Sequence, residues 1–251
     1  MPVPYPEPLT LECFDPNGCR VTVSNVSNLE FSRDDGATWK TYKNAITFKN
    51  GEKICFRGTW STQDTGSSSR TQFACIGKCY IYGNIMSLLD KDNYATMTEL
   101  PYASTFMNLF MENRDIYHAE GKDLVLPATK LRKNCYANMF NGCTNFNYVK
   151  CLATDISASG CTSNWLRSTA RRGTFVKADG MNDWTRYYNG IPEGWTIINA
   201  SEEPTAIDHS ILSIDHSSDA VYDLQGRLII TVNSQLPKGV YIVNGKKISV
   251  R

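Results

Sequence analysis

The chain has 251 residues, enough for one large core or for two to three small domains. Its 26 basic residues against 25 acidic ones leave a net charge of +1, which argues against a nucleic-acid partner because such a partner requires a basic face. No apolar run approaches the roughly 18 residues needed to cross a bilayer as a helix, so we expect no transmembrane segment.

The first third of the chain predicts β-structure. Residues 1–8 carry four prolines and lack the basic and apolar regions of a secretory signal, so we expect an extended arm. Short runs of alternating apolar and polar residues follow, and the turn at 15–18 would join the first two as a hairpin. The pattern predicts a small antiparallel β-sandwich. Its expected strands are 9–14, 20–24, 29–32, 39–42, 46–48, 53–57, 73–76 and 79–82.

One motif in this region has a catalytic precedent. Residues 32–39 match the pattern S-x-D-x-G-x-T-W of the Asp boxes in sialidase propellers, and a functional interpretation would make the chain a glycosidase. A propeller repeats the motif in a longer chain, whereas it occurs once here. We therefore expect a structural hairpin turn, in which Asp side chains bond the backbone and Trp39 packs beneath it.

Three related segments occupy the middle of the chain. They are 105–110, 135–140 and 161–166, and Asn108, Asn138 and Asn164 fall at the same position in each. Self-similarity with a period of 26 to 30 residues is typical of a solenoid, whose repeats bury their apolar faces against one another.

Apolar spacing around these repeats predicts helices alternating with short strands. The expected helices are 85–89, 102–111, 129–140 (α-helical or 3-10) and 155–169, and the expected strands are 123–127, 147–152 and 173–177. Units of helix followed by strand would place the strands side by side in a parallel sheet on one face of the solenoid.

Long motifs in this region indicate a family. The runs CYANMFNGCT at 135–144 and VKCLATDISA at 149–158 resemble the BspA-like leucine-rich repeat proteins of Bacteroides and its relatives. Residues 83–89 and 190–197 are similar to that family's entry and closing segments. The resemblance spans residues 9–198 and implies a surface protein for adhesion or recognition. The array is short and degenerate for that family, with an irregular insert at 112–123.

The end of the chain differs in composition from the repeats. Residues 199–218 are polar and predict a linker. The sequences VYDLQGR and GVYIV that follow resemble the C-terminal sorting module of type IX-secreted proteins of Bacteroidetes, which implies passage across the outer membrane. We thus expect an α+β multidomain protein: an N-terminal antiparallel β-sandwich (1–84), a short α/β leucine-rich repeat solenoid with a cap (85–199), a linker (200–218) and a small C-terminal β module (219–251).

The reactive residues predict no catalysis, cofactor or metal site. Cys75 and Cys79 lack a second pair of ligands, and the three histidines are scattered. No phosphate loop or Gly-x-Ser-x-Gly elbow is present. Cys135 and Cys161 align in the repeat at a spacing within disulfide reach, but we favour stacked free thiols because both occupy core positions.

Strand parity predicts where a ligand would bind. If Leu124, Val149 and Phe175 point inward, then Asp123, Tyr148 and Lys150 lie on the open face of the parallel strands. Tyr187 and Tyr188 are the second candidate pair, whereas Trp184 and Trp195 are expected to cap the end of the solenoid.

These observations favour a non-enzymatic, exported surface protein that recognises a host extracellular protein or a glycan through the solenoid face. The alternative is a carbohydrate-binding accessory protein of a polysaccharide-uptake system, with the N-terminal sandwich as the binding part. An aromatic strip on that sandwich would favour the glycan, and a polar, Tyr-rich solenoid face would favour the protein. A hydrolase with an unrecognised site is the third class considered.

Overall fold

A computed structural model describes residues 5–60, 71–203, 221–223, 239–243 and 246–250. The chain divides into two compact units, 1–203 and 204–251. The expected boundary after residue 84 falls inside the first unit, at the end of a strand.

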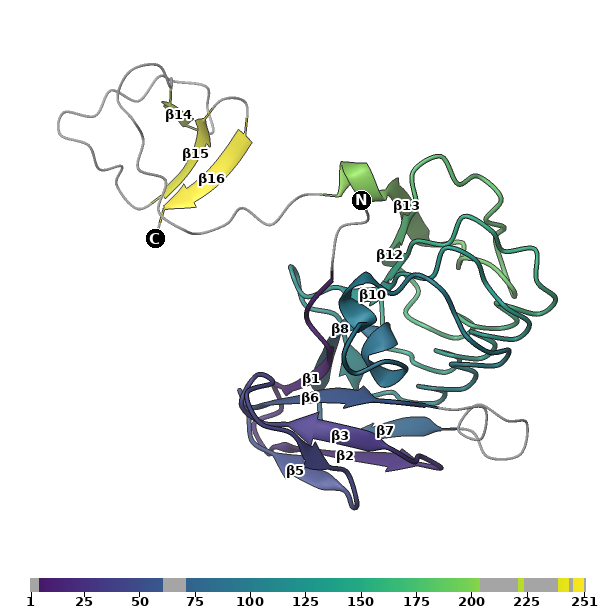
Figure 1. The fold of residues 1–251 in the computed structure, drawn as a ribbon. Coiled ribbons are helices and arrows are strands. Elements are labelled where there is room, and N and C mark those ends of the chain that lie inside the picture. The colour runs from purple at the N-terminus through teal and green to yellow at the C-terminus, as the bar shows by residue number, and fades with distance from the viewer. Residues whose placement is uncertain (1–4, 61–70, 204–220, 224–238, 244–245, 251) are drawn as a thin grey trace. The chain divides into compact units, whose positions relative to one another are not determined.

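One mixed sheet of ten strands runs through the first unit (Figure 1). Along the sheet the order is β13-β12-β11-β10-β8-β1-β6-β3-β4, with β9 pairing to β8. The strands are β1 (Leu9–Cys13), β3 (Leu29–Ser32), β4 (Lys40–Thr41), β6 (Lys53–Gly58), β8 (Cys79–Asn84), β9 (Ile116–Tyr117), β10 (Leu124–Leu126), β11 (Tyr148–Cys151), β12 (Gly173–Lys177) and β13 (Trp195–Asn199).

Strand β8 joins the two halves of this sheet. It pairs antiparallel with β1 on one side and parallel with β10 on the other. The expected sandwich and solenoid therefore share one continuous sheet, and no α-helix occurs among the described residues. The predicted α+β fold class is wrong: the described chain is nearly all β.

A second sheet of three strands has the order β5-β2-β7, formed by β2 (Cys19–Ser24), β5 (Ile46–Phe48) and β7 (Gln72–Ile76). The expected hairpin between the first two runs is also wrong, because β1 and β2 lie in different sheets. The turn at 15–18 instead connects the two sheets, and a disulfide between Cys13 and Cys19 links the ends of this connection. Phe56 of the large sheet packs edge-on against Phe73 of the small one, with 5.1 Å between ring centroids.

Tight turns replace the helices expected at 102–111, 129–140 and 155–169. Each of the three segments places residues with positive φ four positions apart, and these positions align between segments. They are Ser104, Asn108 and Glu112, then Asn134, Asn138 and Gly142, then Gly160, Asn164 and Ser168. Asparagine tolerates this left-handed conformation better than most residues, which explains the Asn found in every repeat.

Backbone hydrogen bonds stack these turns on one another. The amides of Phe106, Asn108 and Phe110 donate to carbonyls of the next segment, whereas the amides between them donate three residues back along their own segment. The same alternation links the second segment to the third. A four-residue turn period places apolar side chains at i and i+4, which is also the spacing of a helix face. The sequence pattern was therefore ambiguous, and the backbone forms a ladder of turns (104–112, 134–142 and 160–168) instead.

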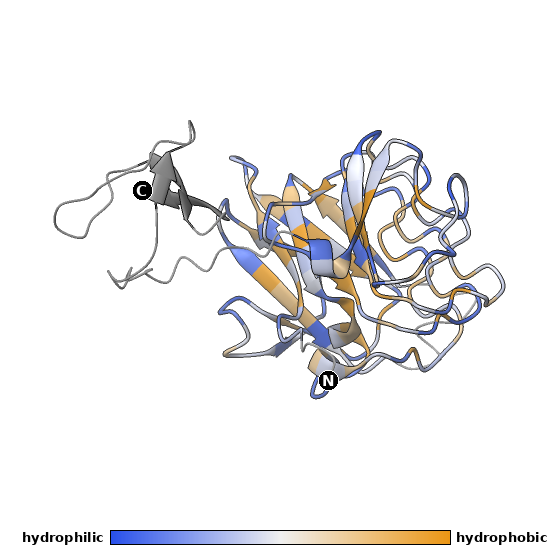
Figure 2. Cartoon of the chain, turned by 90° about the horizontal axis from the view of Figure 1, so that it is seen from above, coloured by the Kyte–Doolittle hydropathy of each residue, from blue (hydrophilic) through white to orange (hydrophobic). Residues whose placement is uncertain are grey.

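The core is continuous from the small sheet to the ladder of turns. Phe110, Phe140 and Phe146 form a row of stacked rings, with 5.5 and 4.7 Å between successive centroids. Figure 2 shows hydrophobic residues recurring along the sheet and the stacked turns. Cys135 and Cys161 are both buried in this core as free thiols.

The remaining elements are small. Three 3-10 helices are described, η1 (Ile85–Leu88), η2 (Tyr94–Thr96) and η3 (Ala200–Glu202), and η1 lies where a helical turn was expected. In the second unit β14 (Val221–Asp223), β15 (Gly239–Val243) and β16 (Lys246–Val250) form an antiparallel sheet in the order β14-β15-β16. The expected linker lies largely outside the described residues.

Candidate binding surfaces

The large sheet has an inner face on the core and an outer face away from it. Leu124, Val149 and Phe175 have no exposed surface, so they face inward as strand parity predicts. Tyr148 and Lys150 therefore project from the outer face of β11, and Asp123 directly precedes β10.

The structure brings these three predicted residues together. Nε2 of His118 lies 3.3 Å from Oδ1 of Asp123, and the His118 ring stacks on Tyr148 with 4.0 Å between centroids. The Tyr148 hydroxyl and the Lys150 ammonium both donate to the carboxylate of Glu203, which follows η3. We call these five side chains the outer-face cluster.

The outer-face cluster is largely covered by the chain itself. Tyr148 is only 6% exposed, and Lys150 also lies 5.7 Å from the ring centre of Tyr5 in the N-terminal arm. Burial and the neighbouring Glu203 raise the pKa of Tyr148, so its hydroxyl stays a donor at neutral pH. Burial disfavours charge on Asp123, yet the hydrogen bond with His118 and the positive charge of Lys150 hold its pKa below the ordinary value.

Three half-buried aromatic rings lie beside this cluster on the same outer face. Phe14 stacks on Tyr80 of β8 with 4.1 Å between centroids, and it meets Tyr117 of β9 edge-on at 5.2 Å. Tyr80 and Tyr117 are paired across the β8–β9 ladder. We call Phe14, Tyr80 and Tyr117 the aromatic strip.

Charged groups border the aromatic strip. Lys122 donates to Glu12 over 2.5 Å, and its ammonium lies 5.7 Å from the ring centre of Tyr80. The Tyr82 hydroxyl donates to the same carboxylate over 2.8 Å. Burial and Glu12 raise the pKa of Tyr82, which keeps that hydroxyl protonated. Apolar ring faces thus adjoin a fixed carboxylate and a fixed ammonium.

Sequence reasoning missed the aromatic strip, although a signal was present. In β8 the alternation of Cys79, Tyr80, Ile81 and Tyr82 sends both tyrosines to one face. Tyr117 lies in the segment treated as an irregular insert, and only the β8–β9 pairing brings it beside Tyr80.

The other predicted pair lies on a separate loop. Tyr187 and Tyr188 are 64% and 67% exposed, and the Tyr187 hydroxyl donates to Glu193 of the same loop over 3.3 Å. The Arg167 guanidinium lies 5.4 Å from the ring centre of Tyr188. Trp184 stacks on Trp165 at 5.4 Å between centroids, so it covers the end of the core as expected.

The Asp-box motif is a structural turn. Asp34 accepts hydrogen bonds from the Ser32 and Thr38 hydroxyls, and the turn joins β3 to β4. Within the described ranges, no group of His, Cys, Asp and Glu is arranged to hold a metal ion. No helix formed by the described part of the chain has the length and apolar character required to cross a bilayer.

Comparisons with known proteins return no match: no family model, no curated protein and no solved structure is detectably similar to this chain.

Proposed function

We propose that this protein is a non-enzymatic recognition protein of the cell surface that binds a glycan through the aromatic strip. The observation that carries the proposal is the packing of Phe14, Tyr80 and Tyr117 against the Glu12–Lys122 pair. Sugar rings offer apolar C–H faces and many hydroxyls. An aromatic face with a carboxylate and an ammonium at its border complements both features.

The position of the strip favours the glycan over a protein partner. Its rings are half-buried and held in place by one another, so binding orders few side chains and loses little entropy. Across the outer-face cluster, in contrast, Glu203 and Tyr5 already occupy the donors that a protein ligand would use. This protein-binding surface would first have to be uncovered.

The export part of the proposal rests on the sequence resemblances alone. A surface-exposed glycan receptor would serve adhesion to a host or the capture of a polysaccharide before uptake. Either role requires binding and no chemistry, and no catalytic residue is assigned.

The test is binding of the full chain to an array of neutral host and plant oligosaccharides, repeated with the variants Tyr80→Ala and Tyr117→Ala. We expect each variant to weaken binding about tenfold or more, because each removes a ring that the sugar covers. Tyr188→Ala is the matched control, since it removes an exposed tyrosine far from the strip in sequence.

Thermal unfolding of each variant separates lost binding from lost folding. Binding that persists in Tyr80→Ala and Tyr117→Ala but disappears in Tyr188→Ala would contradict the proposal. It would also move recognition to the loop of Tyr187 and Tyr188.

A host extracellular protein is the second candidate ligand, favoured by the exposure of Tyr187 and Tyr188 beside Arg167. Tyrosine and arginine are among the residues most enriched at protein-binding hot spots. An array of extracellular-matrix proteins, tested with Tyr188→Ala and Arg167→Ala, distinguishes this candidate from the glycan.

A further inference from the structure

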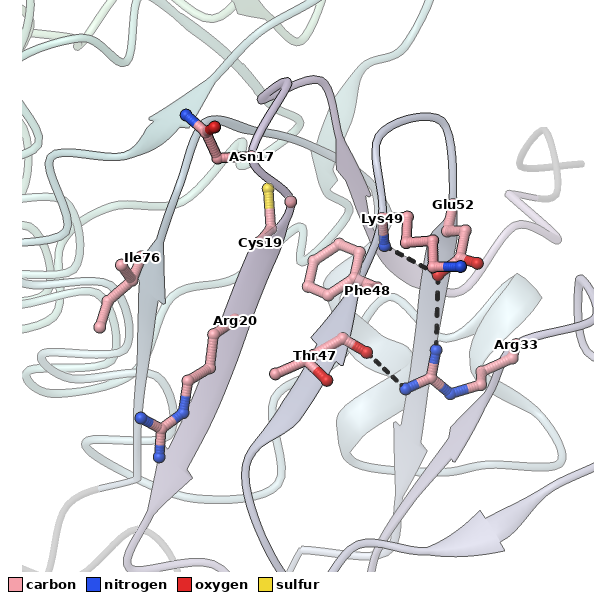
Figure 3. A pocket seen from close by; sticks show the side chains of 10 residues that line it. Asn17, Cys19, Arg20, Arg33, Thr47, Phe48, Lys49, Glu52 and Ile76 are labelled. Atoms are coloured by element: carbon pink, nitrogen blue, oxygen red, sulfur yellow. Dashed lines mark hydrogen bonds and ion pairs between the residues drawn. The ribbon is translucent and has the colours of Figure 1, made fainter.

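The small sheet carries a hollow on its outer side that neither proposed site uses. Figure 3 shows side chains from β2, β5 and β7 and from the neighbouring turns around it. Its volume is about 520 Å³, within the range of sites for small ligands. Its lining includes Arg20, Arg33, Thr47, Lys49, Glu52 and Ile76.

The charges around the hollow are unbalanced. Three basic side chains, Arg20, Arg33 and Lys49, face one carboxylate, Glu52, which leaves a net charge of +2. The chain as a whole is nearly neutral at +1, so this is a local concentration of positive charge. Such a concave positive site attracts anions.

One wall of the hollow is fixed. The Arg33 guanidinium donates to the Thr47 carbonyl over 2.6 Å and lies 3.7 Å from the Glu52 carboxylate. Glu52 also accepts from the Lys49 amide over 2.8 Å, which holds the carboxylate against the turn. Arg33 and Glu52 therefore largely neutralise one another and shape the site.

Two cations and one apolar side chain around the hollow have no partner in the described chain. Arg20 and Ile76 lie across the hollow from Glu52, whereas Lys49 lies beside Glu52 (Figure 3). Neither the Arg20 guanidinium nor the Lys49 ammonium has a hydrogen bond or ion pair among the described residues, and Figure 3 shows Arg20 extending over the face of the sheet. Beside it, Ile76 is 66% exposed, the most exposed large aliphatic side chain described. A free cation and an apolar side chain thus stand in neighbouring strands.

We propose that this hollow binds an acidic sugar, with its anionic group on Arg20, its apolar ring face on Ile76 and a hydroxyl group on Lys49 across the hollow. A guanidinium binds carboxylate and sulfate groups through paired, charge-assisted hydrogen bonds. The volume suits one or two sugar rings. The anionic group is a carboxylate, as in a uronic acid, or a sulfate ester, and both match the same donors.

The experiment is calorimetric titration of the full chain with glucuronic acid, N-acetylglucosamine 6-sulfate and neutral glucose. We expect one or both acidic sugars to bind and glucose not to bind. Which acidic sugar binds more tightly tells a carboxylate ligand from a sulfate ligand. Failure of both acidic sugars to bind at millimolar concentration would overturn the proposal.

Variants locate the site. Arg20→Gln and Lys49→Gln should each weaken acidic-sugar binding about tenfold, because each removes a charge-assisted hydrogen bond. Lys43→Gln is the control, since it removes an exposed lysine outside the hollow. Equal binding by the wild type and Arg20→Gln would place the anion elsewhere.

A further pair of variants separates the two parts of the ligand. Ile76→Ser should weaken binding of the acidic sugar while leaving the binding of inorganic sulfate unchanged. Tyr80→Ala, in the aromatic strip, should leave acidic-sugar binding unchanged. This variant therefore tests the proposal for the hollow separately from the proposal for the aromatic strip. Loss of acidic-sugar binding in Tyr80→Ala would assign it to the strip and overturn the proposal.

Discussion

Residues 9–84 and the ladder of turns belong to one compact unit, but different periods in the sequence build them. In the first region apolar residues alternate, and strands form where alternation predicts them. In the second, residues with positive φ recur every four positions, and turns stack through backbone hydrogen bonds. The first region contains the hollow and two rings of the aromatic strip, Phe14 and Tyr80, and both regions contribute to one continuous core.

The two regions differ in how specifically their sequence patterns predict their structure. Apolar residues that alternate with a period of two indicate a β-strand, and the strands at 29–32, 46–48 and 173–177 lie where expected. Apolar residues that recur about every four positions fit two structures, a helix and a series of turns with left-handed residues. Asn108, Asn138 and Asn164 carried the signal for the second, because asparagine is poor inside helices and tolerant of positive φ.

Strand pairing was less predictable than strand position. Because β2 joins the small sheet and not the sheet of β1, the turn at 15–18 connects two sheets, and the Cys13–Cys19 disulfide spans that connection. Neighbouring strands form a hairpin often enough that local sequence favours it, and only the packing of distant strands decides otherwise. For the same reason parity placed Tyr148 and Lys150 on the outer face, but could not place Glu203 over them.

The largest expected effect tests whether the two regions fold together. Phe140→Ala in the ladder and Phe56→Ala in the sheet each empty a fully buried site, so each should lower the free energy of unfolding by about 3–5 kcal/mol. Because one core joins the regions, both variants should shift a single unfolding transition of residues 1–203. Denaturant unfolding followed by tryptophan fluorescence measures this, and two separate transitions in Phe140→Ala would contradict it.

The next effect concerns the crossing between the sheets. Replacing both Cys13 and Cys19 with serine should lower the free energy of unfolding by about 2 kcal/mol, because the disulfide closes a short loop in the unfolded chain. Chemical denaturation of the oxidised wild type and the double variant gives the difference. Cys135→Ser is the single-cysteine control for effects of thiols in general, and an unchanged midpoint in the double variant would contradict the prediction.

A smaller effect compares glycines of equal conformation in the two regions. Gly51 and Gly142 have φ of +81° and +82°, so alanine at either should cost about 1–2 kcal/mol. A Cβ at Gly51 would contact nothing, whereas one at Gly142 would lie 2.7 Å from the flexible Glu112 carboxylate. Gly142→Ala should therefore be the more destabilising variant in thermal unfolding. The reverse order would show that the ladder relaxes more easily than the turn at Gly51.

The smallest effect is a pH dependence of the Asp-box turn. Hydrogen bonds from Ser32 and Thr38 lower the pKa of Asp34 from 3.8 to about 2. A carboxyl group whose pKa is lower in the folded state stabilises that state at pH values above its ordinary pKa. This stabilisation is lost as the pH falls from about 4 to 2. Asp34→Asn should flatten the stability profile in that window, and Thr38→Val should flatten it partly. Profiles that remain parallel to the wild type would contradict the assignment.

The most direct test of the glycan site is hydrogen exchange of the full chain with and without the neutral oligosaccharide that binds best on the array. We expect added protection of amides near the aromatic strip, in β8, in β9 and around Phe14 and Lys122, with the ladder of turns unchanged. Protection centred on residues 184–191 instead would contradict it and assign recognition to the loop of Tyr187 and Tyr188.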